Sequence, residues 1–207
     1  MQPLQSKKAE ITKSKILTAA EEEFCDKGFF GARIDEIAER AGVNKRMIYE
    51  HFGNKDGLYE SVLISVYERI AEYERSLMID DLEPVLALKH IINKYFSFLE
   101  ANPSFVRMLM WENLNNARAI RGDKAKDLKN PIFNYIRTQI KRGKESGVFK
   151  KDADEHQIVV STMNFVFSYF SNIHTLSALF DRDMNSPAEI IRRADFVSNM
   201  IIDYLKA

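Results

Sequence analysis

The stretch IDEIAERAGVNKRMIYEHFGNK, residues 34–55, contains two short segments of helical periodicity joined at a glycine. The first segment carries one apolar stripe at helical spacing, formed by Ile34, Ile37, Ala38 and Ala41. Gly42 follows where a helix can end in the left-handed conformation, which glycine adopts at little cost. Asn44 is a good N-cap for a second helix, which would bury Ile48 and Phe52. The stretch therefore predicts a helix-turn-helix.

The outer face of the predicted second helix carries two cations and a phenol. Lys45, Arg46 and Tyr49 would be exposed on this face, and Glu50 would lie beside them. A short helix with such groups at its N-terminal end suits the major groove of DNA. A helical hairpin with a solvated outer face inside an ordinary bundle has the same pattern, so these residues alone leave both interpretations open.

A longer motif surrounds this stretch. It reads F-x-x-x-G-[FY], and then I-A-x-x-A-G-V-x-x-x-x-[LI]-Y-x-H-F-x-x-K-x-x-L. The chain supplies its positions in register with Phe24, Gly28, Phe29, Ile37, Ala38, Ala41, Gly42, Val43, Ile48, Tyr49, His51, Phe52, Lys55 and Leu58. With these residues, the segment from Ile11 to Leu63 resembles the N-terminal domain of the tetracycline-repressor (TetR) family. So many fixed spacings are far more specific than an isolated helix-turn-helix pattern. The resemblance implies a DNA-binding regulator.

Length and composition bound the class of protein. The chain has 207 residues, 45% hydrophobic and 29% charged, which suits one large or two small globular domains. No apolar run approaches the roughly 18 to 20 residues of a membrane span, and the N-terminus lacks the apolar segment of a secretory signal. The single cysteine excludes an internal disulfide and fits a reducing compartment. We therefore expect a cytoplasmic protein without membrane contact.

Charge is balanced overall but unevenly distributed. The net charge is zero, which argues against a generally basic coat for nucleic acid. Four lysines in the first fifteen residues face only Glu10, and the predicted second helix with its following turn also has an excess of cations. The acids between residues 21 and 26 are expected to point away from DNA phosphates. This distribution predicts a small DNA footprint.

Secondary structure is predicted to be all-α, because strand-like alternation is absent and the five prolines stand where helices can begin. We expect about nine helices, at approximately 12–27, 34–40, 45–51, 55–78, 84–101, 103–114, 126–146, 154–180 and 187–205. With the resemblance, residues 1–54 would form a helix-turn-helix DNA-binding domain of three helices. Residues 55–207 would then form a helical bundle for effector binding and dimerisation.

Lys45 and Arg46 open the predicted second helix and are the candidates for base recognition. Both can donate to guanine O6 and N7, and arginine can do so with two hydrogen bonds. Family members often have glycine and threonine at the positions of Arg46 and Met47, so base recognition by this chain would be its own. Met47 could contact a thymine methyl group, although an unbranched side chain here readily packs inside.

Other residues of the motif are candidates for contact with the DNA backbone. Tyr49 and Lys55 match family positions that usually hold phosphates, and His51 could contact phosphate or orient the turn. Arg33 stands where the family commonly has a capping threonine or serine; arginine has no acceptor for capping but could reach a phosphate. The complete set of predicted DNA-binding residues is Arg33, Asn44, Lys45, Arg46, Met47, Tyr49, His51 and Lys55.

The C-terminal region carries no catalytic motif. It has no glycine-rich phosphate loop, no G-x-S-x-G and no H-E-x-x-H. The four histidines show no metal-ligand spacing. We therefore expect neither an enzyme nor a bound cofactor or metal.

Large, soft side chains are frequent between residues 95 and 180, where such stripes normally form a core. The resemblance implies an inducer pocket in this half, lined by some of these side chains and a few polar groups. The candidate ligand-binding residues are Tyr95, Met108, Trp111, Asn113, Asn164, Phe167, Tyr169 and His174. The segments NPSFVRMLMWENL and NPIFNYIRTQI also resemble the effector half of the pyrimidine-utilisation regulators in the family.

The last two predicted helices, 154–180 and 187–205, are apolar over a wide arc and need cover on more than one side. The resemblance implies that they pair across a twofold axis in a homodimer. We expect a ligand-responsive homodimeric repressor that binds an inverted-repeat operator in double-stranded DNA, with recognition helices about 34 to 36 Å apart. The alternative is a regulator of the same fold whose C-terminal half binds a protein partner and no small molecule. Neutral charge disfavours a non-specific architectural DNA binder, and the missing motifs disfavour a helical enzyme.

Overall fold

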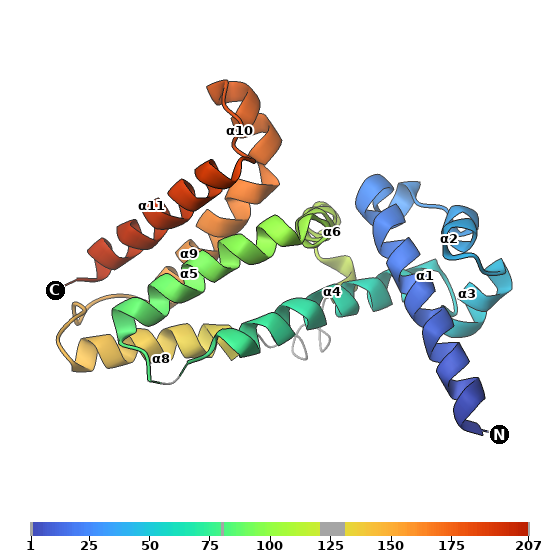
Figure 1. Cartoon of the computed structure of the whole chain (residues 1–207), viewed down its shortest axis with the longest axis horizontal. Coiled ribbons are helices and arrows are strands. Elements are labelled where there is room, and N and C mark those ends of the chain that lie inside the picture. Colours follow the sequence, from blue (N-terminus) through green and yellow to red (C-terminus); the bar gives the residue numbers. More distant parts are fainter. Residues whose placement is uncertain (1, 80, 121–130, 207) are drawn as a thin grey trace. The chain divides into compact units, whose positions relative to one another are not determined.

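The computed structural model describes residues 2–79, 81–120 and 131–206 (Figure 1). These residues form ten α-helices and one short 3-10 helix, and they contain no strand. An isolated antiparallel bridge pairs Phe149 with Lys206 close to the C-terminus. The prediction of an all-α protein is confirmed.

The chain divides into two compact units that are not two simple halves. The first unit draws on residues 1–69 and 107–129, and the second on residues 70–106 and 130–207. Two helices, α4 (Lys55–Leu77) and α6 (Pro103–Leu114), therefore contribute residues to both units. This division into compact units differs from the expected boundary between residues 54 and 55. That boundary separates the predicted DNA-binding part from the predicted effector-binding part, and it stays a prediction.

The first unit is built on α1 (Gln2–Gly31), α2 (Ile34–Ala41) and α3 (Lys45–Phe52). The beginning of α4, most of α6 and the 3-10 helix η1 (Arg118–Ile120) complete it. Apolar side chains spaced by three or four residues on these helices converge on one core. Its fully buried members include Ile16, Phe24, Ile37, Ile48, Leu58 and Leu63.

Helix α1 begins earlier than predicted, at Gln2 and not near residue 12, because proline is tolerated in the first turn of a helix. It is assigned as far as Gly31, but its regular geometry breaks just after the predicted end at residue 27. Gly28 interrupts its regular geometry with φ 66° and ψ 178°. The Trp111 ring lies so close that a Cβ on Gly28 would be 2.8 Å from it. The indole N–H of Trp111 donates to the Cys25 carbonyl at 3.1 Å, which fixes the ring in this place.

Cys25 lies buried beside this contact. Burial, with the nearby Glu21 carboxylate, raises the pKa of the Cys25 thiol to about 12. The thiol therefore stays protonated near neutral pH, and a protonated thiol is a poor nucleophile. This agrees with a packed, unreactive side chain on the inner face of α1.

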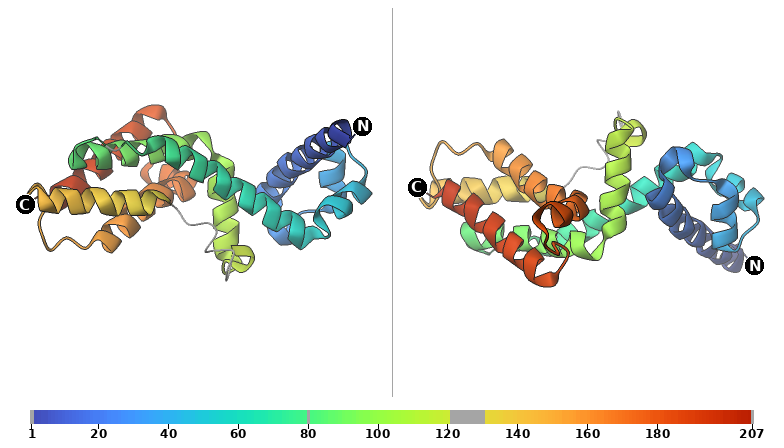
Figure 2. Two further views of the ribbon diagram at one scale, coloured as in Figure 1. Left: turned by 90° about the horizontal axis from the view of Figure 1, so that it is seen from below. Right: turned by 90° about the horizontal axis from the view of Figure 1, so that it is seen from above.

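The second unit is organised around α5 (Pro84–Ala101). Helices α8 (Pro131–Glu145), α9 (Glu155–Ser171) and α11 (Pro187–Leu205) pack against it, and α11 (red) lies along α5 (green) in Figure 2. The inner face of α11 is apolar and buried, with Ile190, Ala194, Val197, Ile201, Ile202 and Leu205. Among the described helices of the protein, none combines the length and the apolar character needed to cross a membrane.

The prediction of one helix over residues 154–180 is wrong. The structure has α9 and then α10 (Ile173–Phe180), with Asn172 between them at φ −112° and ψ 11°. The Asn172 side chain donates to the Ser168 carbonyl at 2.9 Å, and its backbone N–H points to the same oxygen. The backbone bond is an ordinary helical one, but a side-chain hydrogen bond of this kind competes with helix continuation. The expected start of the preceding helix at residue 126 lies outside the described residues.

Candidate nucleic-acid interface

The turn between α2 and α3 closes on Gly42. This residue is left-handed, with φ 64° and ψ 37°. Its N–H donates to the Glu39 carbonyl at 3.1 Å, and the Val43 N–H donates to the Ala38 carbonyl at 3.0 Å. These two bonds satisfy carbonyl groups that the end of α2 would otherwise leave without a partner. The predicted left-handed stop at Gly42 is confirmed.

Asn44 caps the helix that follows. Its side-chain oxygen accepts a hydrogen bond from the Arg46 N–H at 2.8 Å, which confirms the predicted N-cap. Ile48 and Phe52 are buried against the core, as the sequence predicts. The cap and the two apolar anchors fix the direction of α3 from both ends, so its opposite face is presented to solvent.

The exposed face of α3 carries its cations in weak ion pairs. Lys45 Nζ lies 2.7 Å from Asp35 Oδ1, and Arg46 Nε lies 2.7 Å from Glu50 Oε1. The hydrogen bond with Asp35 raises the pKa of Lys45, which keeps the ammonium group charged. Pairs as exposed as these contribute only about 0 to 1 kcal/mol each. Both cations can therefore exchange their carboxylate for a phosphate or a base at little cost.

Tyr49 and Met47 differ in how far they are exposed to solvent. Tyr49 is 43% exposed on the same face as the two cations, whereas Met47 is half-buried. His51 is half-buried as well, with its ring centroid 6.1 Å from that of Phe52. The structure thus places a phenol beside the cations, and it gives Met47 and His51 partial packing roles.

Arg33 precedes α2 and does not cap it through its side chain. The helix start is held in another way, because the Arg33 backbone N–H donates to Glu23 Oε1 at 3.3 Å. The Glu23 side chain is 0% exposed, and it also lies 3.0 Å from Lys27 Nζ and 3.4 Å from an Arg40 nitrogen. One buried carboxylate of α1 therefore joins the beginning and the end of α2.

Sequence reasoning missed this role of Glu23, although a signal was present. Glu23 lies seven residues after Ile16, on the same helical face as this buried residue. A carboxylate on a buried stripe needs donors, and cations stand nearby in sequence. The neighbouring acids are also paired: Glu21 with Arg69 at 2.7 Å, Glu22 with Arg40 at 2.9 Å and Asp26 with Arg107 at 3.3 Å.

Lys55 supports the structure of this unit directly. Its ammonium group donates to the Ala32 carbonyl at 2.6 Å and lies 5.0 Å from the centroid of the Phe29 ring. Partial burial lowers the pKa of Lys55. An ammonium group has three donors, so a phosphate contact is compatible with this bond. Sequence reasoning assigned Lys55 to phosphate and missed that it ties α4 to the segment before α2.

The eight candidate ligand-binding residues are divided between the two compact units. Met108, Trp111 and Asn113 belong to the first, and the other five belong to the second. Met108 is buried, and Asn113 is exposed and donates to the Leu109 carbonyl at 2.9 Å. The Trp111 ring packs on α1, as described above. These three residues therefore have local packing or hydrogen-bonding roles that the sequence did not indicate.

In the second unit, the candidates range from buried to exposed. The Tyr95 hydroxyl donates to the buried Glu74 carboxylate, and Phe167 is half-buried. Asn164 and His174 are exposed. Tyr169 donates to the Met184 carbonyl at 2.6 Å and lines an open cavity of about 480 Å³ between α9, α10 and α11. Their assignment as an effector site stays a prediction.

Comparison with known proteins places these features in a family. A model of the tetracyclin repressor-like C-terminal domain matches residues 84–201, and one of bacterial regulatory proteins of the tetR family matches residues 16–62. The chain belongs to the TetR family. It is a transcriptional regulator with a helix-turn-helix DNA-binding domain, which confirms the resemblance inferred from the motif.

One curated relative of this TetR-family regulator matches nearly its whole length, and another matches somewhat more than half of it. The transcriptional repressor NicS of Pseudomonas putida is 29% identical over 204 residues, which are 98% of this chain and 96% of that protein. The regulator RutR of Escherichia coli K12 is 30% identical over 124 residues, 60% of this chain and 58% of that protein. The solved structure of the fatty acid degradation regulator FadR from Bacillus halodurans has a TM-score of 0.68 at 20% identity, covering 92% of this chain and 94% of that one. That structural likeness supports the fold.

Proposed function

We propose that this protein is a ligand-responsive homodimeric repressor that binds an inverted-repeat operator and acts in the cytoplasm, where bacterial DNA lies. The observation that carries the proposal is the exposed face of α3, where Lys45, Arg46 and Tyr49 stand on a helix held at both ends. Similarity to NicS, a repressor matched over nearly its full length, supports repression rather than activation.

Within the proposed interface, residues divide into base-reading and phosphate-binding groups. Arg46 and Lys45 lie in the first turn of α3, from which recognition helices contact base edges. The donors for phosphates come from residues outside this turn, namely Arg33, Tyr49, His51 and Lys55. Asn44 sets the helix start, and Met47 contributes apolar contact. Residues 1–54 carry the DNA-binding function in this proposal, and the remainder carries effector binding and dimerisation.

Loss of the Tyr49 hydroxyl should weaken binding without changing sequence preference. Tyr49→Phe keeps the ring and removes the donor proposed for a phosphate. We expect affinity to fall by about 1 kcal/mol for cognate and non-cognate DNA alike. Fluorescence anisotropy with both duplexes at fixed salt measures the two affinities. A loss confined to the cognate duplex would show that Tyr49 reads a base.

Loss of the Arg46 side chain should instead relax preference at one base pair of each half-site. Arg46→Ala removes a donor that can bind guanine with two hydrogen bonds, at a cost of about 1 to 3 kcal/mol. Binding to operators mutated at single positions measures the change, and Arg137→Ala on α8 is the matched exposed control. Unchanged preference at every position would refute the assignment of Arg46 to base recognition.

The proposed dimer interface uses α9, α10 and α11. These helices expose large apolar side chains: Val160, Leu179, Phe180, Ile191, Phe196 and Tyr204. An exposed apolar surface of this kind is typical of protein interaction sites. For the effector site, the cavity beside Tyr169 supports a location in the second unit. The dimer could exist in two forms that differ in the spacing of the two recognition helices. A ligand that binds one form more tightly would change the affinity for DNA by at most the ratio of its affinities for the two forms.

Selection from a random DNA library tests the proposal as a whole. The purified full-length protein is incubated with the library at a stated salt concentration, and the retained DNA is sequenced. An enriched inverted repeat with half-sites one helical turn apart, or a multiple of it, is the expected result. Enrichment of single half-sites would refute the dimeric arrangement. No enrichment by the folded protein would refute sequence-specific binding in the absence of ligand.

A further inference from the structure

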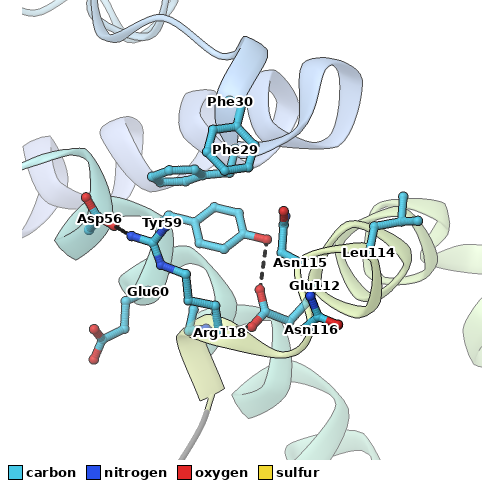
Figure 3. Close-up of a pocket in the computed structure, with 11 residues that line it drawn as sticks. Phe29, Phe30, Asp56, Tyr59, Glu60, Glu112, Leu114, Asn115, Asn116 and Arg118 are labelled. Atoms are coloured by element: carbon cyan, nitrogen blue, oxygen red, sulfur yellow. Dashed lines mark hydrogen bonds and ion pairs between the residues drawn. The ribbon is translucent and has the colours of Figure 1, made fainter.

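The first compact unit contains a cavity of about 410 Å³ that no part of the proposed DNA interface uses (Figure 3). Its walls come from the end of α1, the first turns of α4, the end of α6 and the 3-10 helix η1. A volume of this size is within the range of small-molecule sites, which are roughly 300 to 1,000 Å³. The cavity is therefore large enough for a small organic ligand.

Aromatic rings form one side of this cavity. Phe29 contacts Phe30 edge to face with centroids 5.3 Å apart, and it contacts Tyr59 with centroids 5.2 Å apart. The Phe30 side chain is 77% exposed, and Leu114 across the cavity is 72% exposed. Large apolar side chains with this exposure offer contact area to an apolar part of a ligand. The faces of the aromatic rings attract cations.

Carboxylates give the cavity a negative charge. Asp56, Glu60 and Glu112 line it together with the Arg118 guanidinium group, so the described lining residues carry a formal charge of −2. Glu112 is 2% exposed and accepts hydrogen bonds from the Tyr59 hydroxyl at 3.1 Å and the Ala119 N–H at 2.6 Å. Both partners are neutral, and no cation among the described residues forms an ion pair with Glu112.

The Tyr59 hydroxyl supplies one of the two hydrogen bonds that Glu112 accepts. Burial and the Glu112 carboxylate together raise the pKa of Tyr59, so its hydroxyl stays protonated and donates. Figure 3 shows the Tyr59 hydroxyl directed at Glu112, and both the Tyr59 ring and the Arg118 guanidinium group lie beside Phe29. A buried carboxylate whose partners among the described residues are neutral donors is favourable for a cation that enters beside it.

Arg118 already occupies the position of such a cation. Its guanidinium carbon lies 5.4 Å from the centroid of the Phe29 ring, and the group is paired with Asp56. The Arg118 and Asp56 side chains are 61% and 59% exposed, so water can readily replace this contact. The two preceding residues, Asn116 and Ala117, have φ of 59° and 56°, a region that is costly for L-residues.

We propose that this cavity binds a small aromatic monocation, an arylammonium or arylamidinium compound, that displaces the Arg118 guanidinium from Phe29. The cationic group is held by the ring face and by the carboxylates of Asp56 and Glu112. The aromatic body lies against Phe30 and Leu114.

The site is distinct from the effector site proposed beside Tyr169. The cavity lies in the same compact unit as α2 and α3, so a ligand bound there could change the affinity for DNA. That consequence rests on the proposed function. Binding of the cation itself does not depend on that function. It can therefore be measured on the full-length protein without DNA.

The test compares benzamidine and phenethylamine, two cations, with benzamide, a neutral analogue of benzamidine. Trp111 is the single tryptophan of the chain and neighbours Glu112, so its fluorescence reports binding, and calorimetry provides a second readout. We expect saturable binding of both cations and binding of benzamide weaker by at least about tenfold.

Two substitutions should change cation affinity in opposite directions. Glu112→Gln keeps the hydrogen-bond acceptor and removes the charge, so affinity should fall by about tenfold. Arg118→Ala removes the internal competitor, so affinity should rise by about threefold or more. Glu68→Gln, an exposed carboxylate on α4, is the matched control and should change nothing.

Three results would each overturn the proposal. The first is the absence of binding of either cation at concentrations up to about 10 mM. The second is benzamide binding as tightly as benzamidine. The third is a cation affinity that is unchanged or weaker in Arg118→Ala. Because Arg118 is largely exposed, its substitution remains informative if Glu112→Gln does not fold. Failure of operator selection would leave these binding results unaffected, so the two proposals fail separately.

Discussion

Replacement of Glu23 by alanine should destabilise the helix-turn-helix by about 3 kcal/mol. The substitution removes a fully buried carboxylate that accepts the Arg33 N–H and pairs with Lys27 and Arg40. Loss of one side of a buried pair costs roughly 3 to 5 kcal/mol, and the low end applies because both cations are partly exposed and can be hydrated. Hydrogen exchange of the α2 amides measures the free energy of local opening.

Glu22→Ala is the matched control for this prediction. Glu22 neighbours Glu23 on α1 and pairs with the same Arg40, but its side chain is 56% exposed. An exposed ion pair contributes at most about 1 kcal/mol, so the control should lose little stability. Glu23→Gln should fall between the two, because its amide oxygen still accepts the Arg33 N–H. Equal losses for Glu22→Ala and Glu23→Ala would contradict the bracing role of the buried carboxylate.

Gly28→Ala should destabilise the first unit by a similar amount, about 3 kcal/mol. A side chain at φ 66° is strained, and its Cβ would stand 2.8 Å from the Trp111 ring. The ring cannot move away freely, because its N–H is bonded to the Cys25 carbonyl. Urea denaturation followed by Trp111 fluorescence reports unfolding at this contact. We also expect a shift in the native emission of Trp111, since its surroundings change.

Gly31→Ala distinguishes this contact from a general effect of glycine replacement in α1. Gly31 has no positive φ, and a Cβ there would meet only the Lys27 Cβ at 3.2 Å. The alanine should be tolerated, and its lower backbone entropy in the unfolded chain can stabilise the protein slightly. The prediction for Gly28 fails if both substitutions cost the same.

The sequence alone was sufficient for the features that depend on neighbouring residues. Gly42 and Asn44 determine where α2 ends and α3 begins, because both act on backbone groups within a few residues. Apolar periodicity identified the buried faces of α2 and α3, and the spacing of the motif indicated the family. Local signals failed at Asn172, where a side chain that returns to Ser168 divides a long apolar segment into two helices.

Only the tertiary structure decided how distant segments combine. Glu23 becomes a brace because α2 supplies its donors, and Lys55 ties α4 to Ala32 in the segment before α2. The cavity brings Phe29, Tyr59 and Glu112 together from three helices that are far apart in sequence. Periodicity shows which face of a helix is buried, but it does not show which other helix covers it. Packing determines that partner, and with it which carboxylates and cations meet.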